Sequence, residues 1–151
     1  METLEDTFTA FFERSEPKLR NALVAAYGVE VGTEAASDAL AYGWEHWERV
    51  RGMSNPAGYL YRVGQSKSRR VRRRPPMPVV RRSNPAPWVE PELPKALARL
   101  SERQRVAIIL VHSLGWTYAE TAELLGTSIG TVEVHVQRGL KRLRRSLGVA
   151  L

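Results

Sequence analysis

Residues 117–136 read TYAETAELLGTSIGTVEVHV, and this stretch has the pattern of two helices joined by a short turn. Thr117 and Glu120 have the spacing of a capping box, which begins a helix. Gly126 can adopt the left-handed conformation that ends a helix, and Ser128 is a good N-cap for the next one. The stretch therefore predicts a helix-turn-helix, a motif whose second helix commonly lies in the major groove of DNA.

The second helix of this motif is expected to have one apolar face and one polar face, because its apolar residues recur every three or four positions. The N-terminal part of such a helix reaches base edges, whereas basic residues farther along suit phosphates. An ordinary helical hairpin with a basic tail is the alternative interpretation. The residues left available for DNA are Ser128, Thr131, Val134, His135, Arg138, Lys141 and Arg142.

Helical patterns also cover most of the chain on the N-terminal side of this motif. Capping residues, apolar spacing and Gly or Pro stops define each expected helix. The expected helices cover residues 3–27, 33–50, 56–74, about 93–100, and 102–113.

A proline-rich segment, residues 75–91, has no helical period and is expected to be an extended linker. The prediction is an all-α protein of two small helical domains, residues 1–74 and 92–151, joined by this linker. The helix-turn-helix lies in the second domain. In the first domain, Trp44 and Trp47 are expected in the hydrophobic core.

Charge is distributed unevenly along the 151 residues, whose net charge is +7. Residues 65–83 carry eight bases and residues 136–151 carry five, and neither block contains an acid. Two basic blocks in an otherwise acidic chain suit a protein that binds phosphates at two places, although solvated surface charge is the alternative. The apolar runs are far shorter than the roughly 20 residues that cross a bilayer, and the acidic N-terminus does not resemble a signal peptide. We therefore expect a cytoplasmic protein without membrane insertion.

Residues 92–147 resemble region 4 of the sigma-70 family of RNA polymerase sigma factors. The resemblance lies in LxxLSxxQR at 97–105, in GWTYAETAELLGTSIGTV at 115–132 and in RGLxxLR at 138–144. The group that the chain resembles most is the small extracytoplasmic-function (ECF) sigma factors, which consist of regions 2 and 4 only. The resemblance implies that the helix-turn-helix recognises the promoter −35 element while the protein is bound to RNA polymerase.

The first domain resembles region 2 of the same family. Residues 36–40, ASDAL, together with the two tryptophans that follow, are similar to the polymerase-binding helix of that region. The resemblance implies polymerase contacts for Asp38, Ala41, Tyr42 and Glu45.

Residues 56–63, PAGYLYRV, resemble the segment of region 2 that melts and reads the −10 element. This role suits the residue types, because aromatic faces can hold unstacked bases and cations can hold the strand. The resemblance implies contacts with the −10 strand or its phosphates for Tyr59, Tyr61, Arg62, Lys67, Arg69, Arg70 and Arg72.

The expected partners are promoter DNA and core RNA polymerase, and an anti-sigma factor is a further candidate. Two other functions stay open. One is a sigma-like helix-turn-helix regulator that no longer binds polymerase productively, because Ala41, Tyr42, Ser66 and Arg70 replace residue types that are usual in the family. The other is a protein that captures polymerase or another sigma factor without reading DNA. Since the charge blocks have opposite signs, the first domain could also pack on the second and hide it from DNA.

Catalysis is not indicated by any motif. The three histidines are far apart in sequence and lack the spacing of metal ligands. No phosphate-binding glycine loop and no nucleophile motif occurs, and the chain has no cysteine. The sequence therefore predicts a non-enzymatic protein without catalytic residues, metal or cofactor.

Overall fold

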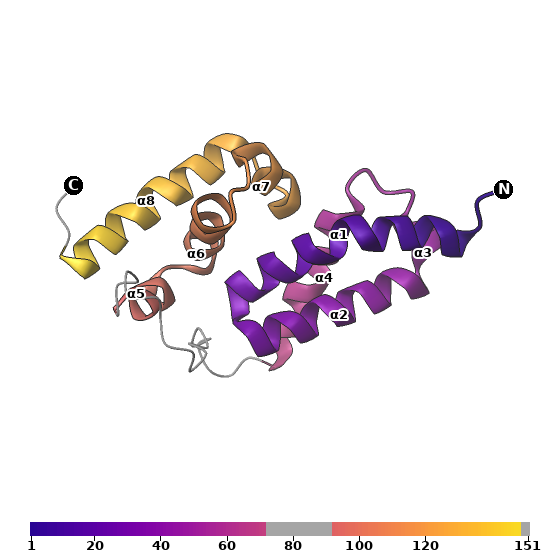
Figure 1. Ribbon diagram of the computed structural model, residues 1–151, viewed down its shortest axis with the longest axis horizontal. Coiled ribbons are helices and arrows are strands. Elements are labelled where there is room, and N and C mark those ends of the chain that lie inside the picture. Colours follow the sequence, from indigo (N-terminus) through magenta and orange to yellow (C-terminus); the bar gives the residue numbers. More distant parts are fainter. Residues whose placement is uncertain (72–91, 149–151) are drawn as a thin grey trace.

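The computed structural model describes residues 1–71 and 92–148, without the side chains of residues 69–71. The described residues form helices and no strand, in two helical parts arranged along the long axis of the molecule (Figure 1). This confirms the all-α prediction, while the expected linker, residues 75–91, lies outside the described residues. The helices are α1 (Leu4–Tyr27), α2 (Val29–Glu45), α3 (Trp47–Val50), α4 (Pro56–Val71), α5 (Leu93–Arg99), α6 (Glu102–Ile108), the π-helical turn η1 (Ile109–Ser113), α7 (Tyr118–Leu125) and α8 (Ile129–Leu147).

In the first part, α1 and α2 lie side by side and α4 packs against both (Figure 1). α1 begins with a capping box in which Thr3 Oγ1 accepts from the Asp6 N–H and Asp6 Oδ2 accepts from the Thr3 N–H, both at 3.1 Å. α1 and α2 approach so closely that a Cβ on Gly32 would lie 2.5 Å from the backbone of α1. The core between these helices includes Leu19 and Leu60, both fully buried.

The predicted helix over residues 33–50 begins earlier than expected and is interrupted at His46, where φ is −117°. Trp47 follows this break and is buried as predicted, with its Nε1 donating to Thr7 Oγ1 at 2.9 Å. The prediction that Trp44 lies in the core is wrong, because 47% of its surface is exposed. Its ring lies at the edge of the α1–α2 pair, where it contacts Phe8 at a centroid distance of 5.2 Å. The buried face of α2 is instead made of small residues and Leu40.

In the second part, the expected capping residues occupy their positions. Ser101, Thr117 and Ser128 cap α6, α7 and α8 through their side-chain oxygens. Gly126 ends α7 in the left-handed conformation, with φ +67°. The predicted helix over residues 102–113 changes into the π-helical turn η1 at Ile109. α7 and α8 form the predicted helix-turn-helix.

The two parts contact each other through α6 on α1 and α7 on α4. Val106, Leu110 and Leu124 of the second part belong to the same buried cluster as the core of the first part. Hydrogen bonds join the parts as well: Asn55 Nδ2 donates to the Glu123 carbonyl at 2.7 Å, and Gln65 Nε2 to Glu102 Oε2 at 3.2 Å. The arrangement is therefore one in which the first part packs against the helix-turn-helix.

Candidate nucleic-acid interface

The N-terminal end of α8 is held by its own hydroxyl groups. Ser128 Oγ accepts from the Thr131 N–H at 3.1 Å and lies 2.8 Å from Thr131 Oγ1. Both residues were predicted to contact DNA, and both act here in the cap. They fix where α8 begins, and therefore how deep its first turn can enter a groove.

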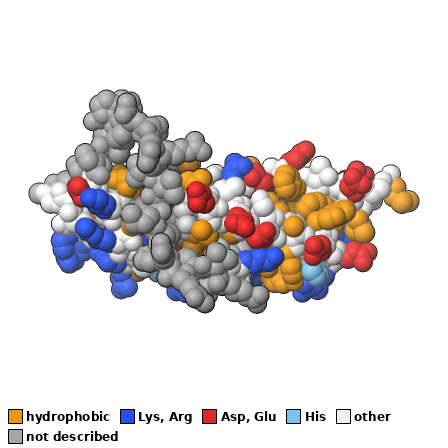
Figure 2. All heavy atoms as spheres, turned by 90° about the horizontal axis from the view of Figure 1, so that it is seen from below, with side chains coloured by type: hydrophobic (Ala, Val, Ile, Leu, Met, Phe, Trp, Pro, Cys, Tyr) orange, Lys and Arg blue, Asp and Glu red, His pale blue; other side chains and the backbone are white. Residues whose placement is uncertain are grey.

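One stripe of α8 faces solvent along most of its length. Val134, Arg138, Lys141 and Arg145 follow one another at helical spacing, and all four are exposed. The opposite face is buried through residues such as Val132 and packs on the rest of the second part. Lys and Arg side chains gather at the end of the molecule opposite the N-terminus (Figure 2). The stripe therefore presents one apolar contact followed by three cations, an arrangement suited to base edges and then phosphates.

Arg142, which was also predicted to contact DNA, has partners inside the second part. Its guanidinium donates to Gln104 Oε1 at 3.1 Å and to the Arg99 carbonyl at 3.0 Å. Arg142 is exposed, but these bonds direct it toward α5 and α6.

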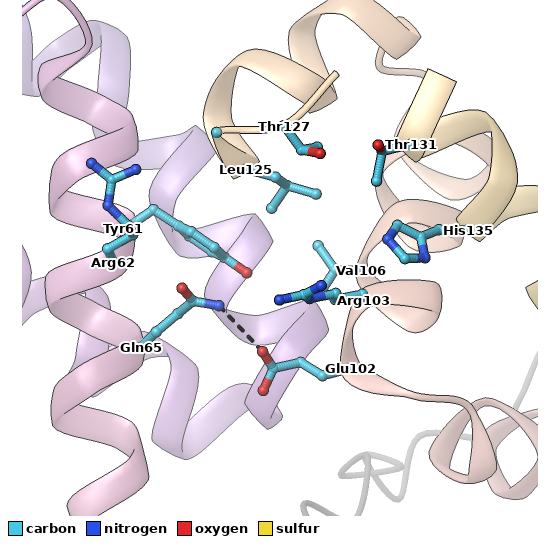
Figure 3. A pocket seen from close by; sticks show the side chains of 11 residues that line it. Tyr61, Arg62, Gln65, Glu102, Arg103, Val106, Leu125, Thr127, Thr131 and His135 are labelled. Carbon is cyan, nitrogen blue, oxygen red and sulfur yellow. Dashed lines mark hydrogen bonds between the residues drawn. The ribbon is translucent and has the colours of Figure 1, made fainter. Parts of the chain in front are cut away.

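A cleft of about 280 Å³ lies between α4 and the first turns of α8 (Figure 3). Arg62 and Tyr61 border it from α4, and Thr131 and His135 border it from α8. The cleft thus brings residues predicted to bind the −10 strand next to residues predicted to read the −35 element. Tyr61, which was predicted to contact the −10 strand, is only 2% exposed, so in this arrangement its ring is not accessible to a base.

His135 is half-buried beside this cleft. Burial lowers the pKa of His135, and the nearby Arg103 and Arg138 lower this pKa further. The imidazole is therefore neutral at pH 7, where it is a hydrogen-bonding group rather than a cation.

The other cations predicted for the −10 strand lie on or after α4. Arg62 is exposed, and its guanidinium lies against the turn of the helix-turn-helix, 3.1 Å from where a Cβ on Gly126 would be. Lys67 is exposed one turn before the end of α4. The side chains of Arg69 and Arg70, and all of Arg72, lie outside the described residues.

Tyr42 and Tyr59, predicted for two different partners, contact each other. Their hydroxyl oxygens are 3.3 Å apart, and Arg49 Nη2 donates to the Tyr42 hydroxyl at 2.7 Å. The hydrogen bond with Tyr59, followed by the one from Arg49, lowers the pKa of Tyr42. The hydrogen bond to Tyr42 in turn raises the pKa of Arg49, which stays a cation.

The predicted polymerase-binding residues Asp38, Ala41 and Glu45 are all exposed on α2. Beside them, a groove of about 370 Å³ between α1 and α2 is lined by apolar side chains that include Phe12 and Trp44. Phe12 is 41% exposed, so this part of the surface offers two aromatic rings to solvent. Hydrophobic side chains gather at the N-terminal end of the molecule (Figure 2).

Arg105 was not among the predicted functional residues, yet it joins the two parts. It is 7% exposed and donates to the carbonyls of Ala25 and Ala26 at the end of α1, at 3.1 Å and 2.7 Å. A third bond at 3.1 Å reaches the Leu100 carbonyl. The signals in the sequence are that Arg105 closes the LxxLSxxQR motif at 97–105 and that this cation directly precedes the apolar run VAIIL.

Within residues 1–71 and 92–148, no group of three or more His, Cys, Asp or Glu side chains could hold a metal ion. No helix in these ranges has the length and hydropathy needed to cross a bilayer.

The family described as sigma-70, region 4 matches residues 91–143. The ECF RNA polymerase sigma factor SigM of Mycobacterium tuberculosis is 43% identical over 54 residues, which are 36% of this chain and 28% of that protein. The ECF RNA polymerase sigma factor ShbA of Streptomyces griseus is 42% identical over 62 residues, 41% of this chain and 30% of that protein. The chain therefore matches less than a third of the length of these curated relatives.

A similarity of fold extends over nearly the whole chain. The sigma factor RpoE of Bartonella quintana, solved in complex with the anti-sigma factor NepR, has a TM-score of 0.64 and 26% identity. The match covers 96% of this chain and 99% of that one, so it includes both helical parts. Region 4 of the sigma-70 family is therefore matched in sequence over residues 91–143, and both helical parts are matched in fold by a sigma factor.

Proposed function

We propose that the protein is a sigma factor that directs RNA polymerase to promoters by binding DNA, and that it acts without catalysis. The observation that carries this proposal is the exposed stripe of α8, held at the end of a capped helix-turn-helix. An α-helix with this shape fits the major groove, and its cations suit phosphates on either side. Because polymerase and promoter DNA are cytoplasmic in bacteria, we expect the protein to act in the cytoplasm.

Within α8, we assign the −35 readout to the stripe. Val134 and Arg138 lie nearest the N-terminal end and are proposed to contact base edges, and Lys141 is proposed to contact phosphate. Thr131 and His135 face α4 across the cleft, so they join the readout only after the two parts separate. Ser128 and Arg142 are proposed to set the position of α8 through the bonds described above.

We propose that polymerase docks on α2. Asp38, Ala41 and Glu45 share one exposed face, because they are spaced at three and four residues. The exposed rings of Phe12 and Trp44 lie beside this face. Aromatic side chains surrounded by polar groups are typical of protein–protein interfaces, which supports this assignment.

The −10 strand is assigned to the first helical part, through Tyr59, Arg62 and Lys67. We include Arg69, Arg70 and Arg72 on the basis of sequence alone, and we leave Tyr61 out because it is buried. In this proposal residues 1–74 and 92–151 act as two domains, and residues 75–91 let them reach separate promoter elements. Since the similar RpoE was solved with an anti-sigma factor, an anti-sigma partner is proposed here as well.

In vitro transcription with purified core polymerase tests this proposal. Run-off product from genomic promoter fragments is the expected result. DNA binding without core and without transcripts would instead support a free-standing regulator. Binding to polymerase without promoter preference would support a capture protein.

The assignment of α8 is tested by a matched pair of substitutions, Arg138→Ala and Arg144→Ala. Both arginines are exposed on α8, but Arg144 lies off the stripe. We expect Arg138→Ala to lose about 1–3 kcal/mol of discrimination between the preferred promoter and a mutated −35 element. Arg144→Ala is expected to discriminate between the two promoters as well as the wild type does. Equal loss of affinity on every sequence would reassign Arg138 to phosphate.

A further inference from the structure

An aromatic pair lies on the surface where α2 ends. The rings of Tyr42 and His46 stack with their centroids 4.1 Å apart and an angle of 25° between their planes. They stand four residues apart, so they share one face of the helix, and His46 Nδ1 lies 3.0 Å from the Tyr42 carbonyl. His46 is exposed. Since one face of its ring rests on Tyr42, the exposed part of the ring includes the outer face.

Two further elements bring a cation and a second tyrosine to this pair. Arg49 comes from α3 and donates to the Tyr42 hydroxyl, while Tyr59 comes from α4 and lies 3.3 Å from the same hydroxyl. The Arg49 guanidinium carbon is 5.9 Å from the centroid of the Tyr59 ring, within the range of a cation–π contact. Three helices therefore converge on one small surface, the end of the first helical part that carries α3 in Figure 1.

The charge on this surface is available to a ligand. Among the described residues, the hydrogen-bond partners of the Arg49 guanidinium are the phenols of Tyr42 and Tyr59, and no carboxylate lies within ion-pair distance of it. Glu45 and Glu48 are its acidic neighbours in sequence, and both are exposed without pairing to it. A guanidinium has five N–H donors, so most of those on Arg49 can bind phosphate oxygens. Lys67 of α4 adds a positive charge near enough to act on Tyr42.

We propose that Tyr42, His46 and Arg49 extend the site for the −10 strand, with an unpaired nucleobase stacked on His46 and its phosphate held by Arg49. The ligand class is single-stranded DNA. This inference rests on the proposed function, because it assumes that the first part engages a melted strand. It moves Tyr42 from the polymerase surface to the DNA surface. Stacked aromatic rings and a cation without a carboxylate partner are the two components that single-strand sites combine.

Binding of a fluorescein-labelled, mixed-sequence single strand of about 12 nucleotides tests this assignment. Fluorescence anisotropy is measured for the full chain, alone and with core polymerase. His46→Ala is expected to weaken single-strand binding roughly 5- to 150-fold, the range for loss of one stacked base. His112→Ala removes an exposed histidine of the second part and is expected to change nothing. Affinity for duplex DNA and for core polymerase should also be unchanged in His46→Ala.

Arg49→Gln provides a second and independent readout. Loss of one phosphate contact should reduce the slope of log Kd against log salt concentration by about 0.7 for a single strand. His46→Ala should leave that slope unchanged, because a stacked base releases no counterion. Circular dichroism of each variant confirms that the helices are retained.

The outcomes separate this inference from the proposed function. If transcription succeeds but His46→Ala and Arg49→Gln bind the single strand like the wild type, the extended site is wrong and the sigma function stands. If transcription fails while both variants still lose single-strand binding, the extended site stands and the proposed function is wrong. Weaker binding of core polymerase by His46→Ala, with unchanged single-strand binding, would make this a protein-docking surface and overturn the inference.

Discussion

Replacing Arg105 with alanine should separate the second helical part from the end of α1. The last carbonyls of a helix have no partner within the helix, and here Arg105 supplies partners for those of Ala25 and Ala26. Its positive charge also lies at the negative end of the α1 dipole. Truncation would leave these two carbonyls, and that of Leu100, in a buried place without their donors.

The bonds themselves set the size of this effect. A hydrogen bond to a charged group contributes about 1.5–3 kcal/mol, and two such bonds cross between the parts. Water that enters the space left by the side chain would hydrogen-bond to the carbonyls and so recover part of the stability that the two bonds contribute. We therefore expect a loss of roughly 3–5 kcal/mol in the free energy of unfolding. Arg105→Lys keeps the charge but loses the forked geometry of the guanidinium. Its free energy of unfolding should therefore lie between those of the wild type and of Arg105→Ala.

Urea unfolding followed by circular dichroism measures this loss. Arg142→Ala is the matched control, because Arg142 also donates to a backbone carbonyl and to a side chain but is exposed and bonds only within the second part. The free energy of unfolding of Arg142→Ala should be lower than that of the wild type by at most about 1 kcal/mol. An Arg105→Ala protein as stable as Arg142→Ala would refute the idea that Arg105 fastens the two parts together.

Three other predictions concern packing, acid stability and DNA affinity. Gly32→Ala should destabilise the first part by more than about 2 kcal/mol, because its Cβ would overlap the α1 backbone. Gly130→Ala should be neutral or stabilising in the same thermal melt, because the nearest atom to its Cβ would be Ser128 Oγ at 4.0 Å, an ordinary contact. Hydrogen bonds within the capping box lower the pKa of Glu120 below its ordinary 4.5, so the stability that this carboxylate contributes is present above that pH and lost below it. Glu120→Gln should therefore flatten the loss of helicity on titration from about pH 5 to pH 3. Because the pKa of His135 is lowered below 6.5, duplex affinity should increase as the pH falls below that value, and this increase should be absent in His135→Gln.

Local chemistry explains why much of the second part could be predicted from the sequence. A cap, a capping box and a left-handed glycine each depend on residues within four positions of one another, as at Thr117, Gly126 and Ser128. All residues of such a signal lie close together in the sequence, so it can be recognised without knowing any tertiary contact. The exposed positions of Val134, Arg138 and Lys141 on α8 follow from the same short-range periodicity.

Contacts between distant segments explain what the sequence did not reveal. Trp44 has the spacing of a core residue, but the break at His46 and the small residues of α2 leave it at the edge of the helix pair. The contact of Tyr42 with Tyr59 joins residues that are 17 positions apart in the sequence. The bonds of Arg105 to α1 join residues that are about 80 positions apart. No periodicity encodes such a pairing, because each partner alone fits an ordinary helix.

The contacts between the two parts have a consequence for how the proposed function is carried out. The cleft of about 280 Å³ that Thr131 and His135 border is far too small to admit a DNA duplex. Thr131 and His135 therefore cannot reach base edges while α4 lies opposite them, although Arg138 on the outer stripe can. For Thr131 and His135 to contact DNA, the bonds from Asn55, Gln65 and Arg105 must break. The free energy needed to break them reduces the observed free energy of DNA binding. A partner that binds the separated parts more tightly than the packed ones would supply that free energy, which is the thermodynamic role that polymerase has in the proposed function.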